Sequence, residues 1–317
     1  MTADHLGDAD TMRVPASPPP STAGATPSAE ERLERGEILC YERCPFALPE
    51  GDDRRFLMEQ QLRPWGHKNI SYDPHTGRLA GFVRRSAEQA ARLRHLLATF
   101  SEAATAWLAG ELPRYARGCH PDRASLRPEE EATRRLRQTA RNDLLHIDAF
   151  PTRPSHGRRI LRLFVNLNPS EPRVWAISEP FARLLARYGP QVGLPAPDDP
   201  PGRLGRSLRR LFRFPRRRLR HPGPGHRSAY DQFMLRFHHF LKTNDDFQER
   251  GPKRFQAFPP GSAWLAFTDG IAYAEVRGRY ALEHSYFITP PSLVLPAESP
   301  AALLARFCGW SALNEAA

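Results

Sequence analysis

Cysteine is scarce in this sequence. The chain of 317 residues contains four, Cys40, Cys44, Cys119 and Cys308, and their spacing matches none of the strong zinc-binding patterns. A four-ligand site in which His120 joins Cys40, Cys44 and Cys119 is an alternative, but free thiols are the usual case in cytosolic proteins. We therefore expect four free cysteines and no structural zinc.

Long apolar runs are also missing. No stretch approaches the roughly 18–20 apolar residues that a membrane-spanning helix requires. The first residues, Met1–Asp10, are acidic and lack the apolar core of a signal peptide. We therefore expect a soluble, cytoplasmic protein, and we also consider peripheral contact with the inner face of the inner membrane.

Negative charge is under-represented. The chain has 46 lysines and arginines against 35 aspartates and glutamates, which gives a formal net charge of +11 at pH 7. Such an excess favours an acidic partner, namely nucleic acid, anionic lipid or a phosphorylated substrate. The alternative explanation is a high-GC genome that favours arginine over lysine. No helix-turn-helix, zinc-finger or RNA-recognition pattern occurs, so no nucleic acid is expected.

Proline is about twice as frequent as usual, and much of it lies in the N-terminal segment and in two later loops. Residues 1–29 combine proline with Ser, Thr, Ala and Gly. This segment has too little apolar surface to offset the entropy lost on ordering. We expect a disordered tail here, with order beginning near Glu30 and a helical turn at Ala29–Glu34. Residues 30–317 are then expected to form a single domain.

A basic insertion lies within that domain, at residues 203–226. Its first part, Arg203–Arg220, contains nine arginines interleaved with leucine and phenylalanine. This pattern favours an amphipathic segment that contacts an anionic membrane surface. A solvated loop is the alternative.

The remaining sequence predicts an α+β fold. Apolar residues recur at helical spacing over Glu88–Leu112 and again over Tyr230–Lys242, and a short helix is expected to start at Phe56. Short apolar, β-prone runs separated by turns indicate a double-stranded β-helix (jelly roll) with flanking helices. An N-terminal α/β portion would pack on the same core. The expected strands are Ile38–Tyr41, one within Lys68–Thr76, Ile160–Asn166, Arg173–Ile177, Trp264–Thr268, Ile271–Val276 and Ser285–Ile288.

His146 and Asp148 form an H-x-D pair. Residues two apart on a strand point to the same face, so both side chains could reach one metal ion. Imidazole and carboxylate, with a further ligand from a distant strand, make the facial triad of non-haem iron(II) oxygenases. The pair alone is common by chance, and its place before the expected strands strengthens the interpretation.

Several motifs resemble the Kdo hydroxylase family. They are RNDLLHIDAFPTRPSHGRRILRLFVNLNP (Arg141–Pro169), KNISYDPHTG (Lys68–Gly77), RASLRP (Arg123–Pro128), EPRVWAISEPF (Glu171–Phe181), SAYDQFMLRFHHFLK (Ser228–Lys242) and FPPGSAWLAFTD (Phe258–Asp269). The resemblance implies Fe(II)/2-oxoglutarate-dependent hydroxylation of the Kdo sugar of Kdo-lipid A, part of the lipopolysaccharide inner core. It also implies Kdo-lipid A, or a related anionic glycolipid, as the partner.

One residue departs from the family pattern. The segment after the F-T-D run carries the distal iron-binding histidine in the family, and here Tyr273 stands in its place. A phenol is a poor iron(II) ligand because its pKa is near 10. Three alternatives stay open: His146 and Asp148 bind iron with water or another group, His284 substitutes, or catalysis is lost. In the last case the chain would bind Kdo-lipid A or another anionic glycan without oxidising it.

The family resemblance also points to Arg127 and Arg162 as the residues that bind 2-oxoglutarate. Arginine binds carboxylates through two parallel hydrogen bonds. Arg162 alternates in phase with Ile160 and Phe164 on its expected strand, which favours an inward position, and surface ion pairing is the alternative. His238 and His239 lie on an expected helix, where packing or exposure is more common than metal binding.

Overall fold

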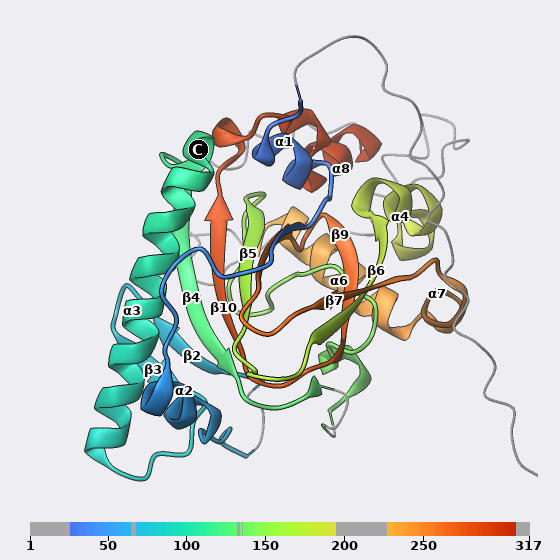
Figure 1. The fold of residues 1–317 in the computed structure, drawn as a ribbon. Helices are drawn as coiled ribbons and strands as arrows, with labels where there is room; N and C mark the ends of the chain where they lie inside the picture. Colours follow the sequence, from blue (N-terminus) through green and yellow to red (C-terminus); the bar gives the residue numbers. More distant parts are fainter. Residues whose placement is uncertain (1–25, 65–67, 132–133, 135, 195–226, 309–317) are drawn as a thin grey trace, which may run out of the picture.

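The fold contains two antiparallel β-sheets and several helices (Figure 1). The computed structural model describes residues 26–64, 68–131, 134, 136–194 and 227–308. Most of the expected disordered tail and the basic insertion lie outside these residues. The helical turn predicted at Ala29–Glu34 is present as a short helix, and Ser28 caps it.

The larger sheet has seven strands in the order β1-β8-β5-β10-β4-β2-β3. These strands are β1 (Leu39–Tyr41), β2 (Ile70–Asp73), β3 (Arg78–Ala80), β4 (Cys119–Arg127), β5 (Arg159–Asn166), β8 (Ala263–Phe267) and β10 (Ala281–Ile288). The smaller sheet, in the order β7-β6-β9, contains β6 (Arg173–Pro180), β7 (Arg254–Phe258) and β9 (Ile271–Arg277). All of these pairings are antiparallel. The N-terminal strands therefore share a sheet with strands from the C-terminal half.

Helices lie on the outer sides of both sheets (Figure 1). The α-helices are α1 (Ala29–Glu34), α2 (Gly51–Met58), α3 (Ala87–Glu111), α4 (Phe181–Tyr188), α6 (Ala229–Thr243), α7 (Asp245–Arg250) and α8 (Pro300–Cys308). Short 3₁₀ helices are η1 (Pro113–Tyr115), η3 (Gln138–Ala140), η4 (Pro190–Val192), η5 (Pro290–Ser292) and η6 (Pro296–Glu298).

Helix α3 covers the outer face of the larger sheet. Ser86 caps it by accepting a hydrogen bond from the backbone N–H of Gln89. Its buried stripe, which includes Leu93 and Leu97, packs against sheet residues such as Leu163 and Leu282. The helical spacing of apolar residues thus decides which face of α3 lies on the sheet.

The inner faces of the two sheets meet in a core that is aromatic at one end. Trp264 of β8 stacks on Phe258 with ring centroids 3.9 Å apart, and Trp175 of β6 stacks on Tyr273 of β9 at 4.5 Å. On its other face the smaller sheet shows small residues, including Ala272 and Ala274, to α4, α6, α7 and α8. Strand alternation therefore directs Tyr273 toward the larger sheet.

Most expected elements are confirmed, and three details are corrected. The helix expected to start at Phe56 instead ends there, as the last turn of α2. The H-x-D segment belongs to no extended strand and forms a single bridge from His146 to Tyr273. Strands β4 and β7 were not expected, because alternating charged and apolar residues with β4's internal Pro121 weaken the strand signal.

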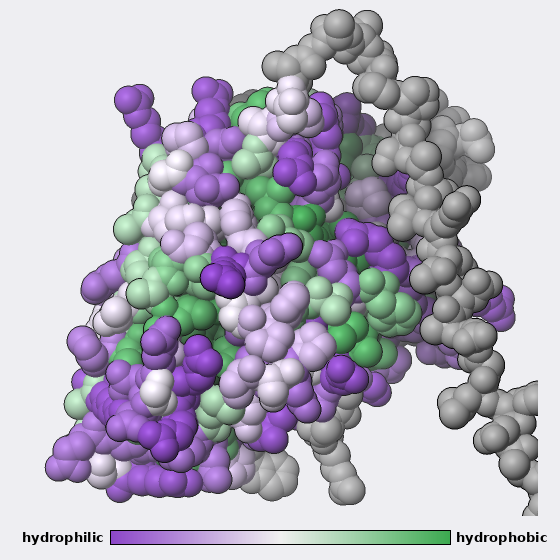
Figure 2. Space-filling model, viewed as in Figure 1, coloured by the Kyte–Doolittle hydropathy of each residue, from purple (hydrophilic) through white to green (hydrophobic). Residues whose placement is uncertain are grey.

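The surface seen from the same side as Figure 1 is largely hydrophilic, with hydrophobic side chains in separate areas between polar ones (Figure 2). Among the described residues, no helix combines the length and apolarity needed to cross a membrane.

Candidate functional site

The segment that carries His146 and Asp148 is held between the two sheets by backbone hydrogen bonds. The N–H of His146 donates to the Tyr273 carbonyl at 3.0 Å, and the N–H of Tyr273 donates back at 2.9 Å. The N–H of Asp148 donates to the Thr268 carbonyl at 2.7 Å. The intervening Ile147 packs among the helices on the other side. Alternation along this segment thus turns both polar side chains inward, as the two-residue spacing predicts.

The His146 ring is buried, neutral and correctly oriented for a ligand. Its Nδ1 lies 2.7 Å from the Leu144 carbonyl, which can only accept, so Nδ1 carries the proton and Nε2 the lone pair. Burial, followed by the charge of Lys242, lowers the pKa of His146 to about 4. Its Nε2 lies 3.6 Å from Oδ1 of Asp148. The lone pair and one carboxylate oxygen therefore face each other across a short gap.

Asp148 stays ionised although it is buried. Burial alone would raise its pKa, but the Arg162 guanidinium holds the pKa of Asp148 well below its usual value. Oδ2 accepts hydrogen bonds from Arg162 Nη1 at 2.8 Å and from the Tyr273 hydroxyl at 3.2 Å. Oδ1 is the carboxylate oxygen that faces His146.

Tyr273 lies beside this pair as a protonated phenol. Its ring lies 4.8 Å, centroid to centroid, from the His146 ring. Burial, and then the charge of Asp148, raise the pKa of Tyr273 well above its usual value. A phenol in this state donates a hydrogen bond to Asp148, and it would have to lose its proton before it could bind a metal as an anion.

His146 and Asp148 fit two positions of a metal site. Bonds to first-row metals are about 2 Å long, and atoms 3.6 Å apart are close enough to share one ion. Within the described ranges, no group of three or more His, Cys, Asp or Glu side chains is placed to hold a metal. Among the described residues, the side chain that lies beside the pair where a third ligand would bind is Tyr273, and water could fill the remaining positions.

Arg162 and Arg127 are buried in a network of carboxylates rather than paired at the surface. Arg162 donates to Asp148, to the Tyr273 hydroxyl at 3.0 Å, and through Nη2 to Glu283. Arg127 donates to Glu283 at 2.6 Å through Nε. Burial would raise the pKa of Glu283, but the two guanidiniums hold it at about 2.

The sequence predicts the inward position of Arg162 correctly. It does not predict that Arg162 contacts Asp148 directly. Arg162 Nε is buried without a hydrogen-bond partner among the described groups. One donor of this guanidinium therefore remains for a ligand.

His284 lies on the opposite face of the larger sheet, so the structure contradicts the alternative in which it replaces the third ligand. Its Nε2 lies 2.7 Å from the hydroxyl of Ser101 on α3. Its ring stacks on Tyr286 with centroids 4.3 Å apart. The neighbouring residue in the strand, Glu283, is the one that faces the site.

Helix α6 contributes His238, which was expected to be packed or exposed on a helix, and side chains that the sequence did not single out, among them Lys242. Ser228 and Asp231 form a capping box at its start. His238 is buried, and its ring centroid is 5.1 Å from that of His146. One turn later, Lys242 has no exposed surface. The four-residue spacing of His238 and Lys242 was the available signal, because such residues share one helix face.

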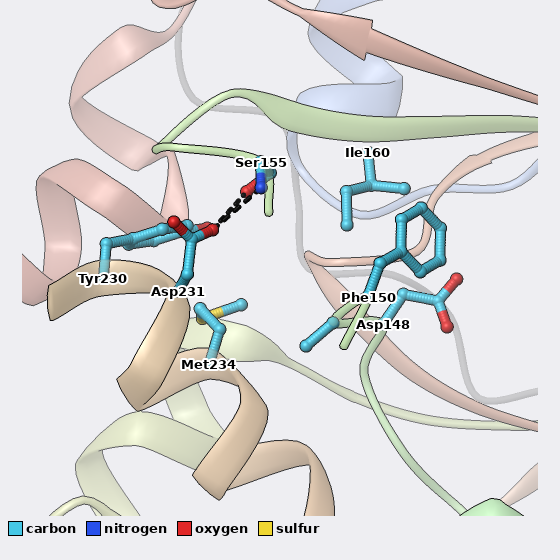
Figure 3. A pocket seen from close by; sticks show the side chains of 8 residues that line it. Asp148, Phe150, Ser155, Ile160, Tyr230, Asp231 and Met234 are labelled. Carbon is cyan, nitrogen blue, oxygen red and sulfur yellow. Dashed lines mark hydrogen bonds between the residues drawn. The ribbon is translucent and has the colours of Figure 1, made fainter. Parts of the chain in front are cut away.

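A small cleft of about 260 Å³, including the part open to solvent, reaches Asp148 (Figure 3). Asp231 borders it and accepts a 2.8 Å hydrogen bond from the Ser155 N–H, which ties the loop after Asp148 to α6. The cleft is lined by Asp148, Ala149, Phe150, Ser155, Ile160, Tyr230, Asp231 and Met234.

The structure thus combines two antiparallel sheets with a buried His–Asp pair between them. The family model of 3-deoxy-D-manno-oct-2-ulosonic acid (Kdo) hydroxylase matches residues 20–311. This chain therefore belongs to the Kdo hydroxylase family. No curated protein sequence matches the chain.

Solved structures of one family member are similar over most of both chains. They are structures of the Kdo hydroxylase KdoO, a non-heme Fe(II) alphaketoglutarate-dependent dioxygenase. The cobalt(II) complex has a TM-score of 0.75 and 32% identity, and covers 91% of this chain and 92% of that one. The complex with alphaketoglutarate and Fe(III) has a TM-score of 0.73 and 32% identity, and covers 89% of each. The apo structure has a TM-score of 0.72 and 33% identity, and covers 88% of each.

Proposed function

We propose that this protein is an Fe(II)/2-oxoglutarate-dependent dioxygenase that hydroxylates the Kdo sugar of Kdo-lipid A. The observation that carries the proposal is the inward-facing His146–Asp148 pair, with Nε2 and Oδ1 3.6 Å apart and Arg162 beside it. Family membership and the similarity to KdoO support the same reaction. The two facing sheets are, in this proposal, the double-stranded β-helix of residues 30–317.

In this proposal His146 and Asp148 hold the iron. The Nδ1–H bond to Leu144 fixes the imidazole orientation, as such outer hydrogen bonds do in metal sites. Tyr273 occupies the place of the third ligand and orients Asp148 through its hydroxyl. When bound, iron(II) with 2-oxoglutarate supplies the oxidising chemistry for hydroxylating a sugar carbon.

Arg127 and Arg162 are proposed to bind the carboxylate of 2-oxoglutarate. Both are buried on the inner face of the larger sheet, on β4 and β5, and share Glu283 as a partner. The Nε of Arg162 is buried without a hydrogen-bond partner among the described groups. We expect Arg162→Ala to weaken 2-oxoglutarate binding, and unchanged affinity would remove this assignment.

The proposed substrate is anionic and the chain is basic, which favours encounter by electrostatic steering. Contact with an anionic membrane surface through Arg203–Arg220 is proposed as well, because that segment interleaves arginine with apolar residues. Removing residues 203–220 is expected to weaken binding to anionic vesicles and to reduce its salt dependence. If the native protein and the deletion variant bind vesicles equally, the solvated-loop alternative replaces this proposal.

The test is an anaerobic titration of the full chain with iron(II) and 2-oxoglutarate, followed by turnover on Kdo-lipid A. A visible metal-to-ligand charge-transfer band and succinate formation are expected for the native protein and for His95→Ala, since His95 is exposed on α3. His146→Ala should lose both signals. Turnover that survives in His146→Ala would exclude the proposed metal site.

The binding-only alternative makes a different prediction for the same experiment. If Tyr273 has abolished iron chemistry, the native protein binds Kdo-lipid A but gives no charge-transfer band and no succinate. The observation behind this alternative is that Tyr273 is held as a neutral phenol.

A further inference from the structure

Two lysines lie beside the His146–Asp148 pair with little to bind. Lys242 is fully buried, and its ammonium makes one 3.4 Å hydrogen bond, to the Thr139 carbonyl. Lys68 is partly exposed, and its ammonium makes one 3.3 Å hydrogen bond, to Asn142 Oδ1. An ammonium has three donors, so the described residues accept only a small part of what these two groups can donate. Across the part of the chain that the structure describes, no carboxylate lies within 4.0 Å of either ammonium.

Both lysines face the same interior as the candidate metal ligands. Lys242 follows His238 by one turn of α6, and the His238 ring lies against His146. The residue after Lys68, Asn69, donates a 3.0 Å hydrogen bond to Glu283. Lys68 and Lys242 donate to Asn142 and Thr139, which lie three residues apart on the segment that leads to His146. The charge of Asp148 acts on both ammonium groups.

The surrounding carboxylates are already matched by arginines. The ion pairs are Asp148 with Arg162, Glu283 with Arg162 and Arg127, Glu131 with Arg127 and Arg134, and Glu275 with Arg173 and Arg127. Four buried carboxylates thus share four guanidiniums, one of which, Arg134, also pairs with the partly exposed Glu129. Neither lysine forms an ion pair within the described residues. Burial and then the charge of Lys68 lower the pKa of Lys242 to about 7, as expected for an uncompensated cation.

The placement of these two lysines is unusual for a chain of this composition. Only three of the 46 lysines and arginines in the chain are lysine. The third, Lys253, is exposed and donates to the backbone carbonyls of Gln248 and Glu249 in the last turn of α7. Almost every other cation in this chain is an arginine, so composition alone does not account for two lysines converging on one interior site.

We propose that Lys68 and Lys242 together bind a carboxylate group next to the His146–Asp148 pair, with access from the partly exposed Lys68. A carboxylate would supply the missing counter-charge and accept the unused hydrogen bonds. The inference rests on the proposed function for its two sources, the acid group of the Kdo sugar and a carboxylate of 2-oxoglutarate. The two lysines would bind a carboxylate in addition to Arg127 and Arg162, whose side chains already form ion pairs with Glu283.

The test measures the affinity of the iron(II)-loaded full chain for 2-oxoglutarate and for free Kdo, by anaerobic calorimetry. Lys68→Met and Lys242→Met are compared with Lys253→Met as the matched control. Each site variant should bind one of the two probes about ten- to a hundred-fold more weakly, the usual loss for a hydrogen bond to a charged group. The control should stay within about two-fold of the native protein.

The pattern of loss identifies the source. Weaker binding of Kdo alone assigns the site to the sugar acid, and weaker binding of 2-oxoglutarate alone assigns it to the co-substrate. Unchanged affinity for both probes in both folded variants overturns the proposal. Failure of the proposed function is a separate result: it appears as absent succinate formation in the native protein, even where carboxylate binding depends on the lysines.

Thermal unfolding without ligand gives a second readout. If Lys242 is a surplus charge, Lys242→Met removes a buried, uncompensated cation and should keep or raise the melting temperature. If Lys242 instead stabilises the C-terminal end of α6, the same variant should melt lower, and that result combined with unchanged binding overturns the proposal. If Lys242→Met does not fold, the binding measurement on Lys68→Met, which changes a partly exposed position, still tests the proposal.

Discussion

The two faces of the larger sheet bury side chains equally well but do so with different chemistry. On the outer face, Leu163 and Leu282 pack against the leucines of α3 in an apolar core. On the inner face, Arg162 and Glu283, their direct neighbours in β5 and β10, form ion pairs next to Asp148. Strand alternation alone separates the two environments.

This difference separates the face of the sheet that mainly stabilises the fold from the face that carries the candidate site. The outer face gains free energy from apolar burial, which requires no particular partner. The inner face contains ionised groups whose desolvation must be offset by accurately placed opposite charges. We therefore expect substitutions on the outer face to change stability alone, and substitutions on the inner face to change stability, ligand binding or both.

The largest effect is expected for Glu283→Ala. It leaves Arg127 and Arg162 without their shared buried partner, and breaking a buried ion pair from one side costs about 3–5 kcal/mol. Urea unfolding measures this loss, with the exposed Glu102→Ala on α3 as the control. A loss below about 1 kcal/mol would show that the inner network contributes little.

A comparable loss of stability is expected for Leu163→Ala on the outer face. Leu163 is fully buried against α3, and such truncations cost about 2–5 kcal/mol. Iron(II) affinity of the folded variant should remain that of the native protein. If iron(II) binding falls with stability, the two faces are coupled and the comparison fails.

His284 offers a pH test of the outer face. Burial lowers its pKa to about 4, below the value near 6.5 of an unfolded chain. Between these two pH values the unfolded state therefore binds more protons than the folded state. The contribution of neutral His284 to the free energy of unfolding is fully present above about pH 6.5 and is lost as pH falls toward 4. His284→Gln should remove about 3 kcal/mol of this acid sensitivity, measured by urea unfolding at pH 7 and pH 4. An unchanged pH dependence would mean that His284 is not held neutral.

The smallest expected free-energy change concerns Tyr273. Tyr273→His places a neutral lone pair where a protonated phenol now lies, and we expect iron(II) binding to tighten about ten-fold, or about 1.4 kcal/mol. Turnover of 2-oxoglutarate on Kdo-lipid A should rise as well. Tyr273→Phe is the matched control, since it removes the hydroxyl and adds no ligand. Equal iron affinity in the native protein and Tyr273→His would show that this position is not the third ligand site.

Local patterns in the sequence determined much of the secondary structure. The leucine spacing of α3 and the β-prone run of β5 predict those elements to within about a residue, because periodic burial leaves a strong local signal. The inward positions of His146, Asp148 and Arg162 also follow from a spacing of two residues. Strand β4 was not predicted, because its charged residues and its proline weaken the local strand signal. In the structure it forms because strands pair with it on both sides.

Only the tertiary structure decided which distant residues meet. His284 and Tyr273 were both candidates for the third ligand, and the sheet register places one against Ser101 and the other against Asp148. The positions of Lys242 and Lys68 beside Thr139 and Asn142 depend on how α6 packs against its neighbours, and no local period encodes them. Backbone hydrogen bonding and alternation act between neighbours in the chain, whereas charge pairing acts between whatever side chains the packed sheets bring together.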